Sequence, residues 1–447
     1  MKKVLILFLF ISSLLQAQYS IKGSLQPVKK YQWALLYKVE GARQVFVKNS
    51  EIKVEKSKGS FEFTLPADAK TGSYRVTYDL QNNGYVDFLF NKENVEFEFN
   101  PNNAEGTTVF KQSKENQLYK EYLSDNSAIQ YKIDSLQSVY FKNRSAETAK
   151  SYKDLVQELK KTQNRYLQNA QGSLAYHFIK ATNRYNSPEI VTQPQQYLDG
   201  AVTHFFDEID FSNENLYNSS FLIDRIADYV FYMNFSQDPE TQKALYKKAS
   251  TIALNKVKDP NFKGDVIEFL ISQFAGIKNA EIVDYLFSDH YDKLPKENQN
   301  IAFKDRIMSE MKVAIGRMAP DFSWKENGKD LSIANLKDSM SYLLIFYSTG
   351  CSHCLREVPQ LFEFMKDKTN TKVIAFAMET DDKAWLKYKN TMPGWHHVLG
   401  LGKWENKIAR TYQVNSTPTY FVLGMDKKII SNPEKLEDLK LVLEQLN

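Results

Sequence analysis

The chain contains only two cysteines, Cys351 and Cys354, and they lie three residues apart. The apolar run Tyr342–Tyr347 ends shortly before them and a helical pattern follows, so we expect Cys351 at a helix N-terminus. Unpaired backbone amides and the helix dipole stabilise an anion there, which lowers the pKa of a thiol. Cys354 lies one turn further on the same helix face, close enough to form a disulfide. This arrangement predicts a redox-active dithiol.

Two other uses of the cysteines stay open. A purely structural disulfide would close so small a loop that it would add little stability. A zinc site would need two further ligands, for which His353, His396 and His397 are the candidates. His396 and His397 could instead simply end a loop.

Length and composition limit the class of protein. The chain has 447 residues, enough for two or three domains, and its 43% hydrophobic and 25% charged content excludes wholesale disorder. A formal net charge of +4 gives no reason to expect a nucleic acid partner.

The N-terminus has the pattern of a secretory signal. Two lysines precede the apolar run Val4–Leu15, and a small residue, Ala17, follows it. The run is short for a bilayer span of about 20 residues, which makes an uncleaved anchor the weaker alternative. We therefore predict cleavage after residue 17 and a periplasmic or otherwise extracytoplasmic protein, without a lipid anchor or stable membrane insertion.

The remaining chain predicts three regions of different class. Residues 18–104 alternate like strands and predict an all-β, sandwich-like domain, with Asn82–Gly84 as a hairpin turn. Residues 105–314 predict an all-α domain, with helical spacing in stretches such as Leu216–Phe235. Residues 315–447 alternate strand and helix and predict a small α/β domain.

Three sequence blocks of this last domain carry a family resemblance. They are Gly316–Phe322, Cys351–Pro359 and Val414–Phe421, and their order and spacing are more specific than a lone pair of cysteines. The domain resembles a thioredoxin fold, and more narrowly the extracytoplasmic thiol–disulfide oxidoreductases of the TlpA/ResA type. The preceding β and helical regions resemble, more loosely, the accessory regions of multidomain members.

The resemblance implies roles for matched residues. Cys351 would attack a substrate disulfide and Cys354 would resolve the mixed disulfide. Pro418 would be a cis-proline facing the dithiol, so that Thr417 before it presents a backbone edge to the substrate. Glu357 matches an acid that assists proton transfer in these proteins.

The sequence also departs from thioredoxin. Ile345 occupies the position of a buried aspartate and Gly350 that of a tryptophan, so we expect Tyr347 to contribute an aromatic wall at the rim. His353, between the cysteines, is expected to stabilise the Cys351 thiolate and so raise the reduction potential.

The sequence thus predicts a thiol–disulfide oxidoreductase without cofactor or metal that acts on protein disulfides. A reductase supplied by a membrane electron donor is the expected direction, although His353 keeps an oxidase or isomerase open. Two other classes remain as alternatives. One is a protein whose β and helical regions bind a peptide or glycan, and the other is a thiol peroxidase.

Overall fold

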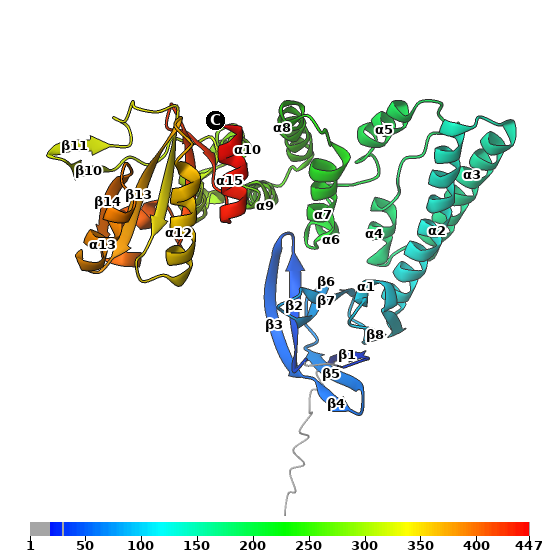
Figure 1. Cartoon of the computed structure of the whole chain (residues 1–447). Helices are drawn as coiled ribbons and strands as arrows, with labels where there is room; N and C mark the ends of the chain where they lie inside the picture. Colours follow the sequence, from blue (N-terminus) through cyan, green and yellow to red (C-terminus); the bar gives the residue numbers. More distant parts are fainter. Residues whose placement is uncertain (1–17, 29–30, 447) are drawn as a thin grey trace, which may run out of the picture. The chain divides into compact units, whose positions relative to one another are not determined.

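The structure of the protein is a computed structural model that describes residues 18–28 and 31–446. The predicted signal segment, residues 1–17, lies outside the described residues. The chain divides into two compact units, residues 1–266 and 267–447 (Figure 1). Each unit is described below by itself.

The first unit begins with two β-sheets that share one hydrophobic core. The five-stranded sheet has the order β4-β5-β1-β8-β9 and the four-stranded sheet the order β3-β2-β6-β7. The strands are β1 (Tyr19–Leu25), β2 (Trp33–Glu40), β3 (Arg43–Glu51), β4 (Lys53–Glu55), β5 (Lys58–Leu65), β6 (Gly72–Asp79), β7 (Gly84–Phe90), β8 (Val95–Phe99) and β9 (Val109–Gln112). Strict alternation places Phe61, Phe63 and Leu65 of β5 in the core. The predicted sandwich-like domain is confirmed.

The predicted hairpin is also confirmed. Strands β6 and β7 pair in antiparallel fashion across the turn that contains Asn82 and Asn83. Asn83 has a φ of 51°, a left-handed conformation that asparagine tolerates better than most residues.

Helices fill the rest of the first unit. They are α1 (Ala104–Thr107), α2 (Lys114–Lys142), α3 (Ala146–Asn169), α4 (Ala175–Ala181), α5 (Pro194–Thr203), α6 (Glu214–Tyr217), α7 (Phe221–Ala227), α8 (Pro239–Lys256) and the start of α9 (Pro260–Gly276). Ser113 and Ser145 cap α2 and α3 by accepting hydrogen bonds from backbone amides of the first turn. The two long helices pack through Ile129 and Ile133 of α2 against Tyr152 of α3. The middle region is helical, as predicted.

The stretch Leu216–Phe235, whose spacing indicates helix, is helical but not one continuous helix. The chain instead forms α6, α7 and then a π-helical turn at Asp228–Met233. Ser219 interrupts the helix because its hydroxyl donates to the Leu216 carbonyl at 2.6 Å and accepts the Phe221 amide at 3.2 Å. Such serine contacts compete with helical hydrogen bonds.

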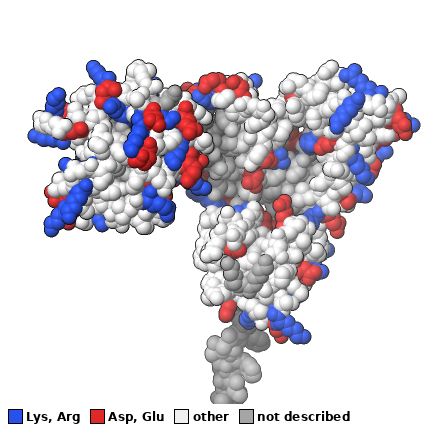
Figure 2. Space-filling model, viewed as in Figure 1, with Lys and Arg blue, Asp and Glu red and all other residues white. Residues whose placement is uncertain are grey.

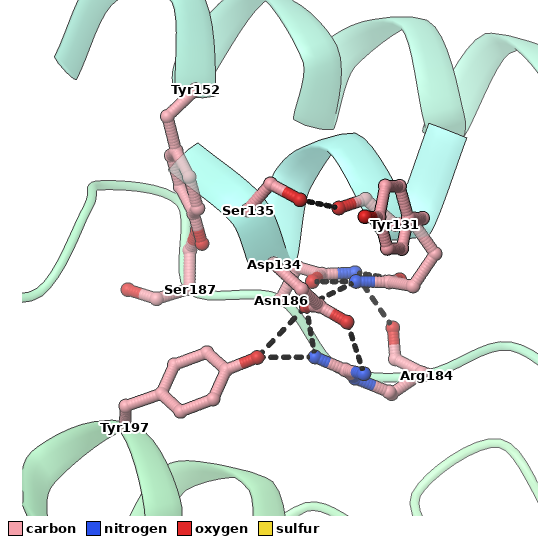
Figure 3. Close-up of polar contacts among 9 residues, drawn as sticks. Tyr131, Asp134, Ser135, Tyr152, Arg184, Asn186, Ser187 and Tyr197 are labelled. Carbon is pink, nitrogen blue, oxygen red and sulfur yellow. Dashed lines mark hydrogen bonds and ion pairs between the residues drawn. The ribbon is translucent and has the colours of Figure 1, made fainter. Parts of the chain in front are cut away.

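A polar network ties α2 to α5 and to the segment between α4 and α5 (Figure 3). Arg184 donates to both carboxylate oxygens of Asp134, at 3.0 and 2.6 Å, and the Tyr197 hydroxyl donates to the same carboxylate at 2.8 Å. Gln130 and Asn186 exchange amide hydrogen bonds at 2.8 and 2.9 Å. The bidentate geometry fixes the path of the segment after α4.

The second unit contains the end of α9, two further helices and an α/β domain. Its elements are α10 (Ala280–Asp289), α11 (Ile301–Glu310), β10 (Ser323–Glu326), β11 (Lys329–Ser332), β12 (Ser341–Tyr347), α12 (Ser352–Met365), β13 (Thr371–Glu379), α13 (Lys383–Tyr388), β14 (His396–Leu401), α14 (Lys407–Thr411), β15 (Thr419–Gly424), β16 (Ile429–Ser431) and α15 (Leu436–Gln445). Strands β12 to β16 form one sheet in the order β14-β13-β12-β15-β16.

The central strand β12 sets the layers of this domain. All of its residues are buried, as expected for a strand covered on both faces. It runs parallel to β13 and antiparallel to β15. Leu343, Ile345 and Tyr347 face a core that includes residues of α12 and α15, whereas Leu344 and Phe346 face a core with α14, β10 and β11. This is the predicted thioredoxin fold (Figure 1).

The surface of the second unit carries mixed charges. Figure 2 shows Lys and Arg side chains interspersed with Asp and Glu on the visible face of this unit. Within the described part of the chain, no helix is both long enough and apolar enough to cross a bilayer.

Candidate active site

The fold places Cys351 where the central strand passes into helix α12. Cys351 is the N-cap residue of α12, and its Sγ accepts the backbone N–H of Cys354 at 3.3 Å. The Cys351 thiol is partly exposed, whereas Cys354, one turn into the helix, is fully buried. The two thiols are free in this structure. A substrate can therefore reach Cys351 but not Cys354.

The surroundings of the two thiols shift their pKa values in opposite directions. Burial alone would raise the pKa of Cys351, but hydrogen bonds from the Thr417 and Cys354 side chains and from the Cys354 and His353 amides lower it overall. Burial raises the pKa of Cys354 to about 12. At neutral pH Cys351 is thus the better nucleophile, and Cys354 needs help to lose its proton.

The loop before β15 forms the other side of the site. The Cys351 thiol donates to the Thr417 carbonyl at 3.2 Å, and the bond between Thr417 and Pro418 is cis. Thr417 and Pro418 are both half-buried. The structure therefore brings the pair Cys351 and Cys354 next to the pair Thr417 and Pro418, although Cys351 and Thr417 are 66 residues apart in the sequence.

Glu357 and His353 lie on α12 beside the cysteines but contact other side chains. Glu357 accepts a hydrogen bond from the Tyr420 hydroxyl at 3.2 Å and from Arg356 at 3.0 Å. The exposed His353 ring contacts Arg356 at 2.9 Å. The hydrogen bond by which His353 lowers the pKa of Cys351 comes from its backbone amide rather than from its imidazole.

The sequence led us to expect Tyr347 at the rim of the site, but the structure buries it. Its side chain is 0% exposed, because it has the same parity along β12 as Ile345 and points into the core under α12. In this conformation it cannot form an exposed wall for a substrate. Its ring lies 5.8 Å from that of Tyr388 on α13.

Three polar atoms in this core are buried and lack a well-formed hydrogen bond within the described residues. They are the Tyr347 hydroxyl, the Tyr388 hydroxyl and the Trp385 indole nitrogen. All three side chains pack in the same cluster as Cys354. Burial raises the pKa of Tyr347, and the Trp385 N–H opposes this shift only weakly.

Glu379 is a residue of the site that sequence reasoning missed. It is buried at the end of β13, and its carboxylate accepts the backbone N–H of Thr349 at 2.6 Å. Thr349 belongs to the short segment between β12 and Cys351, so Glu379 holds the loop that carries the nucleophile. The signal available in the sequence was an acid directly after an apolar strand, Lys372–Met378.

The histidines considered as metal ligands lie in separate surroundings. His396 and His397 begin strand β14 rather than ending a loop. His396 contacts Glu326 of β10 at 2.8 Å, and His397 contacts the Met392 carbonyl at 2.9 Å. Across the described residues, no three His, Cys, Asp or Glu side chains converge as the ligands of a metal ion would. The geometry gives the zinc alternative no support.

Comparison with known proteins agrees with this fold. Residues 340–429 match a family model described as Thioredoxin-like. The thiol–disulfide oxidoreductase ResA of Bacillus thuringiensis (strain Al Hakam) is 30% identical over 123 residues, which cover 27% of this chain and 69% of the relative. ResA of Bacillus anthracis matches equally well.

Solved structures were also found. A thiol–disulfide oxidoreductase from Bacteroides fragilis NCTC 9343 is 25% identical and covers 29% of this chain and 100% of its own, with a TM-score of 0.27. A thioredoxin-like protein from Bacteroides caccae is 17% identical and covers 59% of this chain and 98% of its own, with a TM-score of 0.30.

Fold and sequence together define a thioredoxin-like thiol–disulfide oxidoreductase. The chain belongs to the ResA family of thiol–disulfide oxidoreductases, with β and helical regions preceding the thioredoxin domain.

Proposed function

We propose that this chain reduces disulfide bonds of extracytoplasmic proteins through Cys351 and Cys354. The observation that carries the proposal is the contrast between the two thiols. One is accessible with a lowered pKa, and the other is buried with its pKa raised to about 12. The family supports proteins as the thiol partners.

In the first step the Cys351 thiolate attacks one sulfur of the substrate disulfide. The substrate S–S bond breaks, a bond forms between Cys351 and one substrate sulfur, and the other substrate sulfur leaves as a thiolate that takes up a proton. The helix N-terminus and the Cys354 amide, 3.3 Å from Cys351 Sγ, stabilise the attacking anion.

In the second step Cys354 loses its proton and attacks Cys351. The mixed disulfide breaks, the Cys351–Cys354 disulfide forms, and the second substrate sulfur leaves as a thiolate. Glu357 is the proposed proton acceptor because it lies one helical turn beyond Cys354 and contacts Tyr420, which packs in the same core as Cys354. The substrate gains two electrons and the dithiol loses two.

Turnover as a reductase needs a thiol donor that returns two electrons to the dithiol. An extracytoplasmic location, supported by the signal-like N-terminus, would place that donor at the membrane. The contact of the His353 ring with Arg356 and Glu357 supports a modest effect of its imidazole on the potential.

Two variants test the roles of the thiols. Cys351→Ser should abolish insulin reduction, because no exposed thiolate remains to attack. Cys354→Ser should instead accumulate a mixed disulfide between Cys351 and the substrate, visible on a non-reducing gel. If Cys351→Ser keeps the wild-type rate, or if Cys354→Ser traps nothing, the proposed roles are wrong.

The direction is tested by the reduction potential of the pair in a thiol redox buffer series. A value near or below roughly −250 mV supports a reductase. A value above roughly −200 mV would overturn this direction and indicate an oxidase or isomerase.

A further inference from the structure

A groove of about 550 Å³ in the second unit begins next to the proposed dithiol. Pro418 and Thr419 line it, and the residue before them, Thr417, contacts Cys351 Sγ at 3.2 Å. Other lining residues come from outside the thioredoxin fold. They include Gly276 at the end of α9 and Glu310 at the end of α11.

The helical side of the groove is fixed to the thioredoxin fold. Val313, just after α11, packs in a core cluster with residues of β12 and β15. The Gln413 amide donates to the Ser309 carbonyl, and the Gly316 amide donates to the Ile429 carbonyl at 2.7 Å. These contacts form the groove before any substrate arrives, which lowers the entropy loss on binding.

The groove runs beside a strand edge that is open over three residues. Thr419, Tyr420 and Phe421 pair with β12 on one side. On the other side, β16 pairs only with Val422 and Leu423, and all three earlier residues line the groove. An open edge of this kind can bind an extended polypeptide through main-chain hydrogen bonds.

We propose that the segment from the end of α9 through α11 completes a substrate groove, which holds an extended stretch of the substrate polypeptide beside the disulfide being exchanged. This inference rests on the proposed function of the dithiol. It gives part of the accessory helical region a role in selecting substrates. The chain then prefers protein disulfides, which fill the groove, over small disulfides, which reach only Cys351.

Gly276 offers a way to fill the groove. It is exposed and lines the groove, and a Cβ added to it meets no atom within 4 Å. A side chain at position 276 therefore begins in open space. Leu441 on α15, which is 59% exposed and outside the groove lining, provides the matched control Leu441→Trp.

The experiment compares two oxidised substrates, insulin and oxidised glutathione, with the full chain and both variants. We expect Gly276→Trp to lower the ratio of the insulin rate to the glutathione rate by about tenfold, since a filled groove excludes the polypeptide. Leu441→Trp should keep the wild-type ratio. If Gly276→Trp keeps a ratio within twofold of wild type, the proposal that the groove holds the substrate polypeptide is wrong.

Failure of the proposed function gives a different result. In that case the wild-type chain reduces neither substrate, whatever the state of the groove. A thermal unfolding midpoint of Gly276→Trp equal to that of Leu441→Trp shows that the substitution leaves the fold intact.

A charge reversal gives a second test. Lys278 lines the groove and is exposed, together with Glu310 and Glu434. Lys278→Glu makes all three charges negative, so KM should rise several-fold for a disulfide peptide with acidic flanks and fall for one with basic flanks. An equal response of the two peptides contradicts binding in the groove.

Discussion

Two fully buried tyrosines of this chain differ in whether their hydroxyl makes a well-formed hydrogen bond. Tyr152, in the helical region, donates its hydroxyl to the Ser187 carbonyl at 3.0 Å, beside the network of Asp134 and Arg184 (Figure 3). Tyr347, behind the dithiol, has a buried hydroxyl without a well-formed hydrogen bond within the described residues. Burial raises the pKa of both phenols.

The difference separates a scaffold from a candidate reaction site. Most buried polar groups in a scaffold are satisfied, because an unpaired one costs about 1–3 kcal/mol. In the helical region the hydroxyls of Ser173 and Ser250 are exceptions, and they lie singly. Three buried polar groups without a well-formed hydrogen bond share one core with Cys354, which marks a place where stability was not the only requirement. The following predictions use the two regions to test this contrast.

The largest contrast is expected between the two thiols themselves. In the folded reduced chain at pH 7, Cys351 should react with iodoacetamide at least about 10³ times faster than Cys354, because the thiolate is the nucleophile. The labelling rate of Cys351 should rise with pH and reach its plateau at a pH below the pKa of an ordinary thiol, because the pKa of Cys351 is lowered. Mass spectrometry of the labelled peptides measures both rates.

The same pKa shifts predict how stability depends on pH. The folded pKa of Cys354, about 12, lies above that of the unfolded thiol, so the contribution of this thiol to the free energy of unfolding is present at lower pH and is lost as pH rises toward 12.

The control for the labelling experiment is the unfolded chain. In urea both thiols should react alike. Equal labelling of Cys351 and Cys354 in the folded chain would contradict the asymmetry.

In the helical network, Asp134→Ala should lower the free energy of unfolding by about 1–2 kcal/mol, because Arg184 and Tyr197 lose their acceptor. Denaturant unfolding measures the loss. The rate of insulin reduction per folded molecule should stay at the wild-type value. A large fall in that rate would give the network a part in the reaction.

The smallest effects come from a matched pair of tyrosine variants. Tyr152→Phe should destabilise the chain by about 1 kcal/mol, because the Ser187 carbonyl loses its donor. Tyr347→Phe should cause no loss, because its hydroxyl has no such bond to lose. Equal losses in the two variants would remove the contrast. A slower exchange rate in Tyr347→Phe at unchanged stability would link this hydroxyl to the dithiol.

The sequence predicted elements better than contacts across the fold. The apolar run Tyr342–Tyr347 falls within one residue of β12 at both ends, and the helix predicted after the first cysteine is α12. Hydrophobic periodicity encodes such elements locally. The domain boundaries remain predictions, since the division into units falls at residue 266, inside α9.

The misses have identifiable causes. Glu379 holds the Thr349 amide 30 residues away, and no local pattern shows which strand end meets which loop. The rim position expected for Tyr347 disagrees with strand alternation, which puts this residue on the same buried face as Ile345. The break after α6 depended on one serine side chain binding the backbone.

The position of β1 has a consequence for how the chain becomes folded during synthesis. This strand, the first element described, lies inside its sheet, antiparallel to β5 and parallel to β8. A chain that emerges N-terminus first can pair Tyr19–Leu25 with β5, but it must leave the other edge of this strand unpaired until β8, which ends at Phe99, has also emerged. During that interval its backbone is open to any other strand edge, so a partner that shields it would help the sandwich to form.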